Sequence, residues 1–202
     1  MVPGVNYVLR ATSFNGSETG NYTFKTSSLG TASSLVSTAV PTVFSNFFST
    51  DIGQVGSVDS AGNFVKIANS PNFNDIALSS DNRLFGITDS QLYSVDPVSG
   101  SSSPIGNLGA SVGILGLEFS PSNVLYGAGG SNLYTINQTT GAASLVANLG
   151  SNFDASGDLL FDPVSNRFLA TSVGNSDDSL FSVSLTGQAT KIGNIGFNWS
   201  LD

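Results

Sequence analysis

The chain contains no cysteine and no histidine in 202 residues. Without cysteine it can have no disulfide framework, no thiol nucleophile and no thiolate metal site. Without histidine, a Ser-His-Asp triad, an imidazole general base and ordinary histidine-rich zinc or iron sites are excluded too. Carboxylates, lysine and tyrosine remain for catalysis, so the two absences narrow the enzyme classes without removing all of them.

Charged residues are also scarce, at 10% of the chain, and the formal net charge is -8. The basic residues are scattered and form no patch; they are Arg10, Lys25, Lys66, Arg83, Arg167 and Lys191. This charge balance argues against nucleic acid and anionic membrane surfaces as partners. No apolar run reaches the ~18 residues of a membrane helix, so no membrane insertion is expected.

The surface composition and the N-terminus point in different directions. Abundant Gly, Ser, Thr and Asn with little charge is common in exported β-rich proteins, which predicts an extracellular or cell-surface location. Residues 1–10 lack the basic start and apolar stretch of a signal peptide. Both observations are reconciled if the chain is a fragment of a longer exported protein.

A repeated unit accounts for most of the sequence. Residues 73–109 align without gaps to residues 114–150 at an offset of 41, and 12 of the 37 positions are identical. Weaker similarity places further copies on both sides, so that the expected units are about 43–70, 71–110, 111–150 and 151–196, with another beginning at 197–202.

Each unit reads as four short strands separated by Ser, Asp, Asn and Gly turns. In the second unit we expect these strands at 75–78, 83–88, 91–95 and 102–106. Four strands in about 40 residues match the strand number and repeat length of a propeller blade. The segments are too short and too rich in glycine and β-branched residues for helical repeats. The prediction is therefore an all-β fold, a β-propeller of four-stranded blades.

The number of blades predicts an incomplete ring. Propellers close with typically 4–8 blades, because each sheet buries its faces against neighbouring blades. About four blades are present here, so a larger ring missing some of its blades is favoured over a four-bladed ring. We expect exposed blade faces to associate with the remaining blades of the same propeller or with a second copy.

The N-terminal region differs from the repeats. Residues 1–30 are predicted to form a β-hairpin, with turn pairs Asn15-Gly16 and Thr19-Gly20, and residues 31–42 a linker. This segment resembles the C-terminal end of the bacterial pre-peptidase C-terminal (PPC) domain, an accessory module of secreted proteins. The resemblance is carried by Gly4, Tyr7, Leu9, Ala11, Ser13, Phe14, Gly16, Gly20, Tyr22 and Phe24. An ordinary edge hairpin is the alternative.

The repeats themselves resemble a broad group of bacterial extracellular propellers, the YVTN/NHL-like and quinoprotein-like repeat families. The segments LFG…LYSVDPVSG (84–100) and LYG…LYTINQTTG (125–141) carry this resemblance. The tryptophans that mark quinoprotein and WD40 blades are missing, since the only tryptophan is Trp199. The resemblance therefore implies the fold, and no cofactor follows from it.

Candidate binding residues lie in the loops that lead into the innermost strands, at one end of the ring axis. These residues are Asn74, Asp75, Asn152, Asp154 and Asn198. Their oxygen atoms suit a hard cation such as Ca²⁺ or the hydroxyl groups of a sugar. Alternatively, the same side chains cap turns by bonding to the backbone. We expect Asp96-Pro97 and Asp162-Pro163 to be turn residues, and the acidic loop 174–179 to be solvated.

These observations predict a non-catalytic binding or scaffold module whose ligand is a protein or a glycan. The alternative is a propeller enzyme, a lyase or lactonase-type hydrolase, that uses axial carboxylates and a divalent metal. Such a site normally requires histidine, arginine or several inward carboxylates, and the loops here supply Asp75 and Asp154 alone. A structural repeat in a large adhesin is a third interpretation that the sequence does not separate from the first.

Overall fold

Fifteen β-strands make up the secondary structure of the computed structural model, which describes residues 47–50, 52–59, 61–109, 113–173 and 178–195. The first sheet contains β1 (Phe48–Thr50), β2 (Gln54–Val58) and β3 (Phe64–Asn69). The second contains β4 (Asp75–Leu78), β5 (Leu84–Ile87), β6 (Gln91–Val95) and β7 (Ser102–Asn107). The third contains β8 (Gly116–Phe119), β9 (Leu125–Gly129), β10 (Asn132–Ile136) and β11 (Ala143–Asn148). The fourth contains β12 (Ala155–Asp162), β13 (Arg167–Ser172), β14 (Ser179–Val183) and β15 (Ala189–Asn194).

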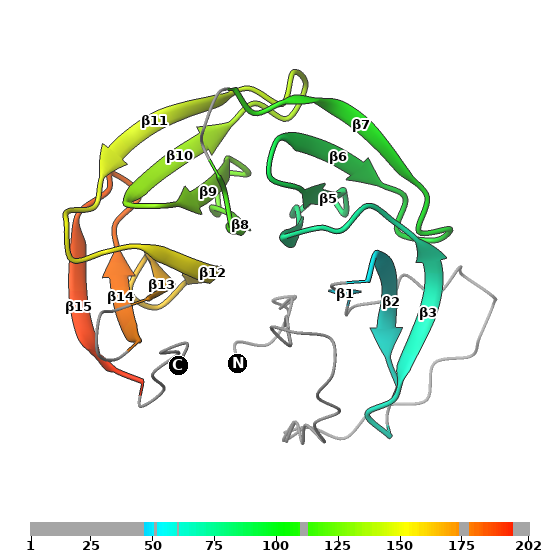
Figure 1. Cartoon of the computed structure of the whole chain (residues 1–202), viewed down its shortest axis with the longest axis horizontal. Coiled ribbons are helices and arrows are strands. Elements are labelled where there is room, and N and C mark those ends of the chain that lie inside the picture. Colours follow the sequence, from blue (N-terminus) through cyan, green and yellow to red (C-terminus); the bar gives the residue numbers. More distant parts are fainter. Residues whose placement is uncertain (1–46, 51, 60, 110–112, 174–177, 196–202) are drawn as a thin grey trace, which may run out of the picture.

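Each sheet is an antiparallel meander in which the strands follow one another in chain order. Figure 1 shows the four sheets side by side in an arc, with β4, β8 and β12 toward its centre and β3, β7, β11 and β15 on its outer rim. Neighbouring sheets touch through their inner strands, β1 with β4, β4 with β8 and β8 with β12. This arrangement confirms the predicted all-β propeller with about four blades.

The strands of the second sheet agree with those expected from the sequence to within one residue at each end. The predicted hairpin at 1–30, the linker at 31–42 and the unit beginning at 197 lie outside the described residues. Among the described residues, no helix has the length and apolarity needed to cross a membrane.

The first hairpin of each complete sheet turns at an asparagine with a left-handed backbone. Asn82, Asn123 and Asn166 have φ of 63°, 62° and 55°. Asparagine adopts this conformation more readily than other side chains because its short amide bonds locally to the backbone. The repeat therefore preserves asparagine at these positions for a conformational reason.

The third hairpin of each four-stranded sheet turns at a glycine that also touches the preceding blade. Gly141 has φ of 78°, and a Cβ placed on it would overlap the carbonyl oxygen of Gly106 in β7. Likewise, a Cβ placed on Gly100 would overlap Ala68 of β3, and a Cβ placed on Gly187 would overlap Ala147 of β11. Glycine is thus required by both the turn and the close approach of two blades.

The core lies between the sheets rather than within one of them. Between the second and third sheets, Phe85, Leu92, Leu117 and Phe119 are among the buried residues of one cluster. The rings of Phe85 and Phe119 are 5.7 Å apart and tilted. Burying one such side chain contributes about 1.5–3 kcal/mol. Blade-to-blade packing therefore contributes to stability, and it fixes the inner strands that carry the candidate site.

Candidate functional site

The predicted site lies where the innermost strands begin, and we call this end of the axis the axial mouth. Asn74 precedes β4, whereas Asn152 and Asp154 precede β12. Asp75 is the first residue of β4. The fifth predicted residue, Asn198, is outside the described residues.

Asn74 joins three segments of the axial mouth through its side chain. Its Nδ2 donates hydrogen bonds to Asp89 Oδ1 at 2.8 Å and to the carbonyl oxygen of Ile114 at 3.0 Å. Its backbone N–H donates to the Ile87 carbonyl at 2.7 Å. Both amide hydrogens are therefore used to hold the turn before β6 and the loop before β8.

Asp75 is buried, with 2% of its surface exposed, and its carboxylate bridges two blades. Its Oδ1 accepts the N–H of Ile76 at 2.7 Å, and its Oδ2 accepts the N–H of Leu117 on β8 at 2.7 Å. The two carboxyl oxygens thus satisfy two backbone donors that would otherwise be buried without a partner.

Glu118 of β8 repeats this bridge one blade further along the arc. Its Oε1 accepts the N–H of Phe119 at 2.7 Å, and its carboxylate also takes a hydrogen bond from the Phe161 backbone on β12. Burial raises the pKa of the Glu118 carboxyl to about 7, and the charge of Asp158 adds to this rise, while the two hydrogen bonds oppose it.

Asn152 and Asp154, which precede β12, are exposed. The backbone of Asp154 is held on both sides, because its N–H donates to Ser172 Oγ at 2.9 Å and its carbonyl accepts the N–H of Val173 at 2.9 Å. Within the described ranges, no three His, Cys, Asp or Glu residues are grouped to hold a metal ion. Of the four predicted residues that the structure describes, Asn74 and Asp75 use their side chains in contacts within the fold, and Asn152 and Asp154 are exposed.

A polar cleft that the sequence did not predict lies between the second and third sheets, and we call it the Arg83 cleft. Its volume is about 550 Å³. The buried side chains of Leu84 and Phe85 form part of its lining. Its polar groups come from Asn82, Arg83, Ser94, Asp96, Ser99, Ser101, Ser103 and Gln138.

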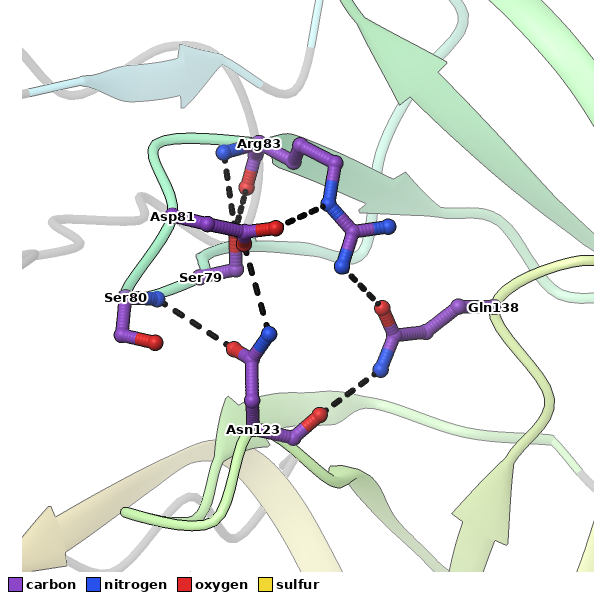
Figure 2. A network of polar contacts seen from close by, with 6 residues as sticks. All are labelled: Ser79, Ser80, Asp81, Arg83, Asn123 and Gln138. Atoms are coloured by element: carbon purple, nitrogen blue, oxygen red, sulfur yellow. Dashed lines mark hydrogen bonds and ion pairs between the residues drawn. The ribbon is translucent and has the colours of Figure 1, made fainter.

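Arg83 is held in this cleft by one residue from each of two sheets, as Figure 2 shows. Its Nε donates to Asp81 Oδ2 at 2.8 Å, and its Nη2 donates to Gln138 Oε1 at 2.8 Å. Gln138 Nε2 in turn donates to the carbonyl of Asn123 at 2.8 Å. The guanidinium also lies over the ring of Phe85, 5.4 Å from its centroid. These contacts set the orientation of the Arg83 guanidinium.

Asp81 is the acceptor around which this network is built. Its Oδ1 accepts Ser79 Oγ at 2.5 Å and Asn123 Nδ2 at 3.3 Å (Figure 2). The hydrogen bonds from Ser79 and then from Arg83 lower the pKa of the Asp81 carboxyl to about 2. The carboxylate therefore stays charged and balances the charge of Arg83 at any physiological pH.

One sequence signal for the cleft exists, and it is a departure from the repeat. In the turn before the outer strand, the second sheet has Pro97 after Asp96, whereas the third sheet has Gln138 after Asn137. Only a glutamine at this place can reach Arg83 with a carbonyl oxygen. The presence of glutamine where the second sheet has proline is therefore the sequence feature that could have indicated the Arg83 cleft.

Comparisons with solved structures identify the fold. A Bacteroides thetaiotaomicron protein of unknown function matches 68% of this chain and 38% of its own length, with a TM-score of 0.54 and 17% identity. Virginiamycin B lyase from Staphylococcus aureus matches 72% of this chain and 50% of its own length, with a TM-score of 0.51 and 11% identity. A chain of the nidogen/laminin complex matches 75% of this chain and 62% of its own length, with a TM-score of 0.59 and 9% identity.

The chain thus spans less than two thirds of the length of each of these proteins. No protein-family model and no curated protein matches its sequence. The similar structures include both a lyase and a protein from a protein–protein complex, so the likeness does not select between catalysis and binding. What this chain shares with all of them is the β-propeller architecture.

Proposed function

We propose that the chain is a non-catalytic binding module of a secreted or cell-surface bacterial protein, and that it binds a glycan in the Arg83 cleft. The observation that carries this proposal is the orientation of Arg83 by Asp81 and Gln138 from two different blades. A guanidinium fixed in advance loses little rotamer entropy when a ligand binds.

The chemistry of the cleft suits a sugar. Serine hydroxyls donate and accept, Gln138 and Asn82 carry amides, and Arg83 has five N–H donors of which Asp81 and Gln138 take two. Sugar hydroxyls need both donors and acceptors along one wall, next to an apolar surface that can contact the ring carbons. Because Asp81 balances the charge of Arg83, an uncharged glycan fits better than a polyanion.

The catalytic alternative would use Asp75 and Asp154 at the axial mouth with a divalent metal such as Ca²⁺. A hard cation in a protein is bound by six to eight oxygen ligands. Both oxygens of Asp75 already accept backbone N–H groups, and Asp154 is exposed on a separate loop. These contacts favour a structural role for Asp75, which supports the proposal of binding without catalysis.

The test is a glycan array probed with the labelled chain, followed by titration calorimetry on any glycan that binds. Two variants remove the proposed contact: Arg83→Gln deletes the guanidinium, and Gln138→Pro introduces the proline that the equivalent turn of the second sheet has at Pro97, and so preserves the turn. Arg167→Gln is the matched control, because Arg167 begins β13 as Arg83 precedes β5 but donates to Ser182 and Gln188 instead.

We expect at least tenfold weaker binding for both cleft variants and unchanged binding for the control. Equal affinity in all three variants would place the ligand elsewhere. Turnover of a lactone or a polyuronate in the presence of Ca²⁺, abolished by Asp154→Asn, would replace this proposal with the enzyme.

A further inference from the structure

The outermost strand of each sheet presents a free edge within the described residues. The strands β3, β7, β11 and β15 each pair with one neighbour only, and Figure 1 shows them on the outer rim of the arc. An unprotected edge of this kind pairs with a strand of another chain, and natural proteins prevent this with lysine, proline or a bulge. The four edges can therefore be compared for such protection.

Three of the four outer strands carry a protecting residue at one equivalent position, and β11 does not. In every sheet the register between the last two strands shifts at the same place. The residues on the outer strand at this shift are Lys66, Pro104, Leu145 and Lys191, which pair with Gly56, Tyr93, Tyr134 and Phe181. Leu145 is 61% exposed. All four edges share the register shift, but the edge of the third sheet lacks the lysine or proline that adds to the protection of the other three.

The backbone of Leu145 faces away from its own sheet. Ala143 sends its N–H outward to the Leu108 carbonyl of the preceding blade at 2.8 Å, while Ser144 pairs with Thr135 of β10. Backbone groups alternate in direction along an antiparallel strand, so the N–H and carbonyl of Leu145 point outward like those of Ala143. Leu145 is therefore the centre of the exposed part of this edge.

The charge distribution indicates what pairs with this edge. No Asp, Glu, Lys or Arg occurs between Phe119 and Phe153, although the chain as a whole carries a net charge of -8. Two copies meeting at β11 would therefore bring no like charges together across the pair. Two copies meeting at β3 or β15 would instead set lysine near lysine, which is destabilising across a strand pair.

We propose that β11 is a self-association edge, at which β11 of one copy pairs antiparallel with β11 of a second copy. Such a contact is isologous, because the same surface is used by both copies. It joins the two third sheets into one continuous sheet and places Leu145 of each copy next to the two-fold axis. The contact is independent of the Arg83 cleft and of any ligand there.

Sedimentation velocity of the full chain over a range of concentrations tests this proposal. We expect a reversible monomer–dimer equilibrium that Leu145→Lys weakens at least tenfold, because it restores the lysine of β3 and β15. The matched control is Val164→Lys, which replaces an apolar residue that is 84% exposed in the turn before β13. This control should leave the equilibrium unchanged, and the thermal melts of both variants verify folding.

A covalent test follows from the absence of cysteine, because Leu145→Cys introduces the only thiol in the chain. We expect this variant to form a disulfide-linked dimer under mild oxidation at concentrations where Val164→Cys stays monomeric. A chain that is monomeric throughout, or an association that Leu145→Lys leaves intact, would overturn the proposal. Binding of an extended foreign peptide to a monomeric chain at β11 would also overturn it, in favour of a different partner.

Discussion

Asp75 at the start of β4 accepts the N–H of Leu117 on β8 with a distance of 2.7 Å, so a carboxylate joins two blades at their inner strands. Inner strands of neighbouring blades belong to different sheets, and their facing N–H groups are not satisfied by a ladder. Glu118 provides the same bridge to the Phe161 backbone in the next blade. The buried Asp75 and the partly buried Glu118 therefore each connect two neighbouring blades.

We predict that Asp75→Asn lowers the free energy of unfolding by about 2 kcal/mol, because an amide offers one acceptor where two buried N–H groups need one each. Chemical denaturation followed by fluorescence measures this change. Asp154→Asn is the control: this side chain is exposed, so the change should stay within about 0.5 kcal/mol. Equal effects of the two substitutions would contradict the bridging role of Asp75.

Gly141 provides a second test of blade-to-blade contact. We predict that Gly141→Ala is clearly more destabilising than Gly130→Ala, although both glycines have a left-handed backbone. A Cβ at Gly130 meets no atom within 4 Å, so alanine there costs only about 1–2 kcal/mol of backbone strain. A Cβ at Gly141 also overlaps the Gly106 carbonyl and separates the second and third blades. Thermal unfolding of the two variants compares these costs directly, and equal losses would show that the contact with Gly106 adds nothing.

Asn123 allows the turn conformation to be separated from the polar network around it. We predict that Asn123→Ala is more destabilising than Asn166→Ala by about 1 kcal/mol. Both residues have a left-handed backbone, but the Asn123 side chain also accepts the N–H of Ser80 at 3.3 Å and donates to Asp81. Both variants should lose the same stability from placing alanine in a left-handed conformation. The difference between their free energies of unfolding then measures the contribution of the polar network in Figure 2. Urea denaturation measures it; identical losses would mean that the network adds no stability.

The repeat predicted the propeller because strand length and turn chemistry are local properties. The expected strands 75–78 and 91–95 coincide with β4 and β6 for this reason. The partner of Asp75 was not predictable, since Leu117 is 42 residues away and is reached only after two blades pack. The same limit applies to the Arg83 cleft, where Gln138 lies 55 residues from Arg83. Thus the propeller architecture can be predicted from the sequence repeat, whereas the polar contacts of the candidate sites form only between residues of different repeats.

Glu118 makes the stability of the arc depend on pH. Its folded pKa of about 7 is above the ordinary value of 4.5, so the folded chain holds this proton more tightly than the unfolded chain. The free energy of unfolding should therefore be unaffected by this group below pH 4.5 and should fall as the pH rises from 4.5 through 7. A shift of this size corresponds to about 3 kcal/mol across that window.

We predict that Glu118→Gln flattens this decline, because the glutamine carries no charge to bury beside Asp158. Urea denaturation at pH 5, 6, 7 and 8 measures both chains. The carboxyl groups of Asp59, Asp81, Asp96 and Asp162 do not interfere, since their pKa values are lowered by hydrogen bonds and their contribution is lost only as the pH falls below 3.8. If wild type and variant declined in parallel, the pH dependence would have to come from a group other than Glu118, and the carboxylate bridge between β8 and β12 would be charged throughout this range.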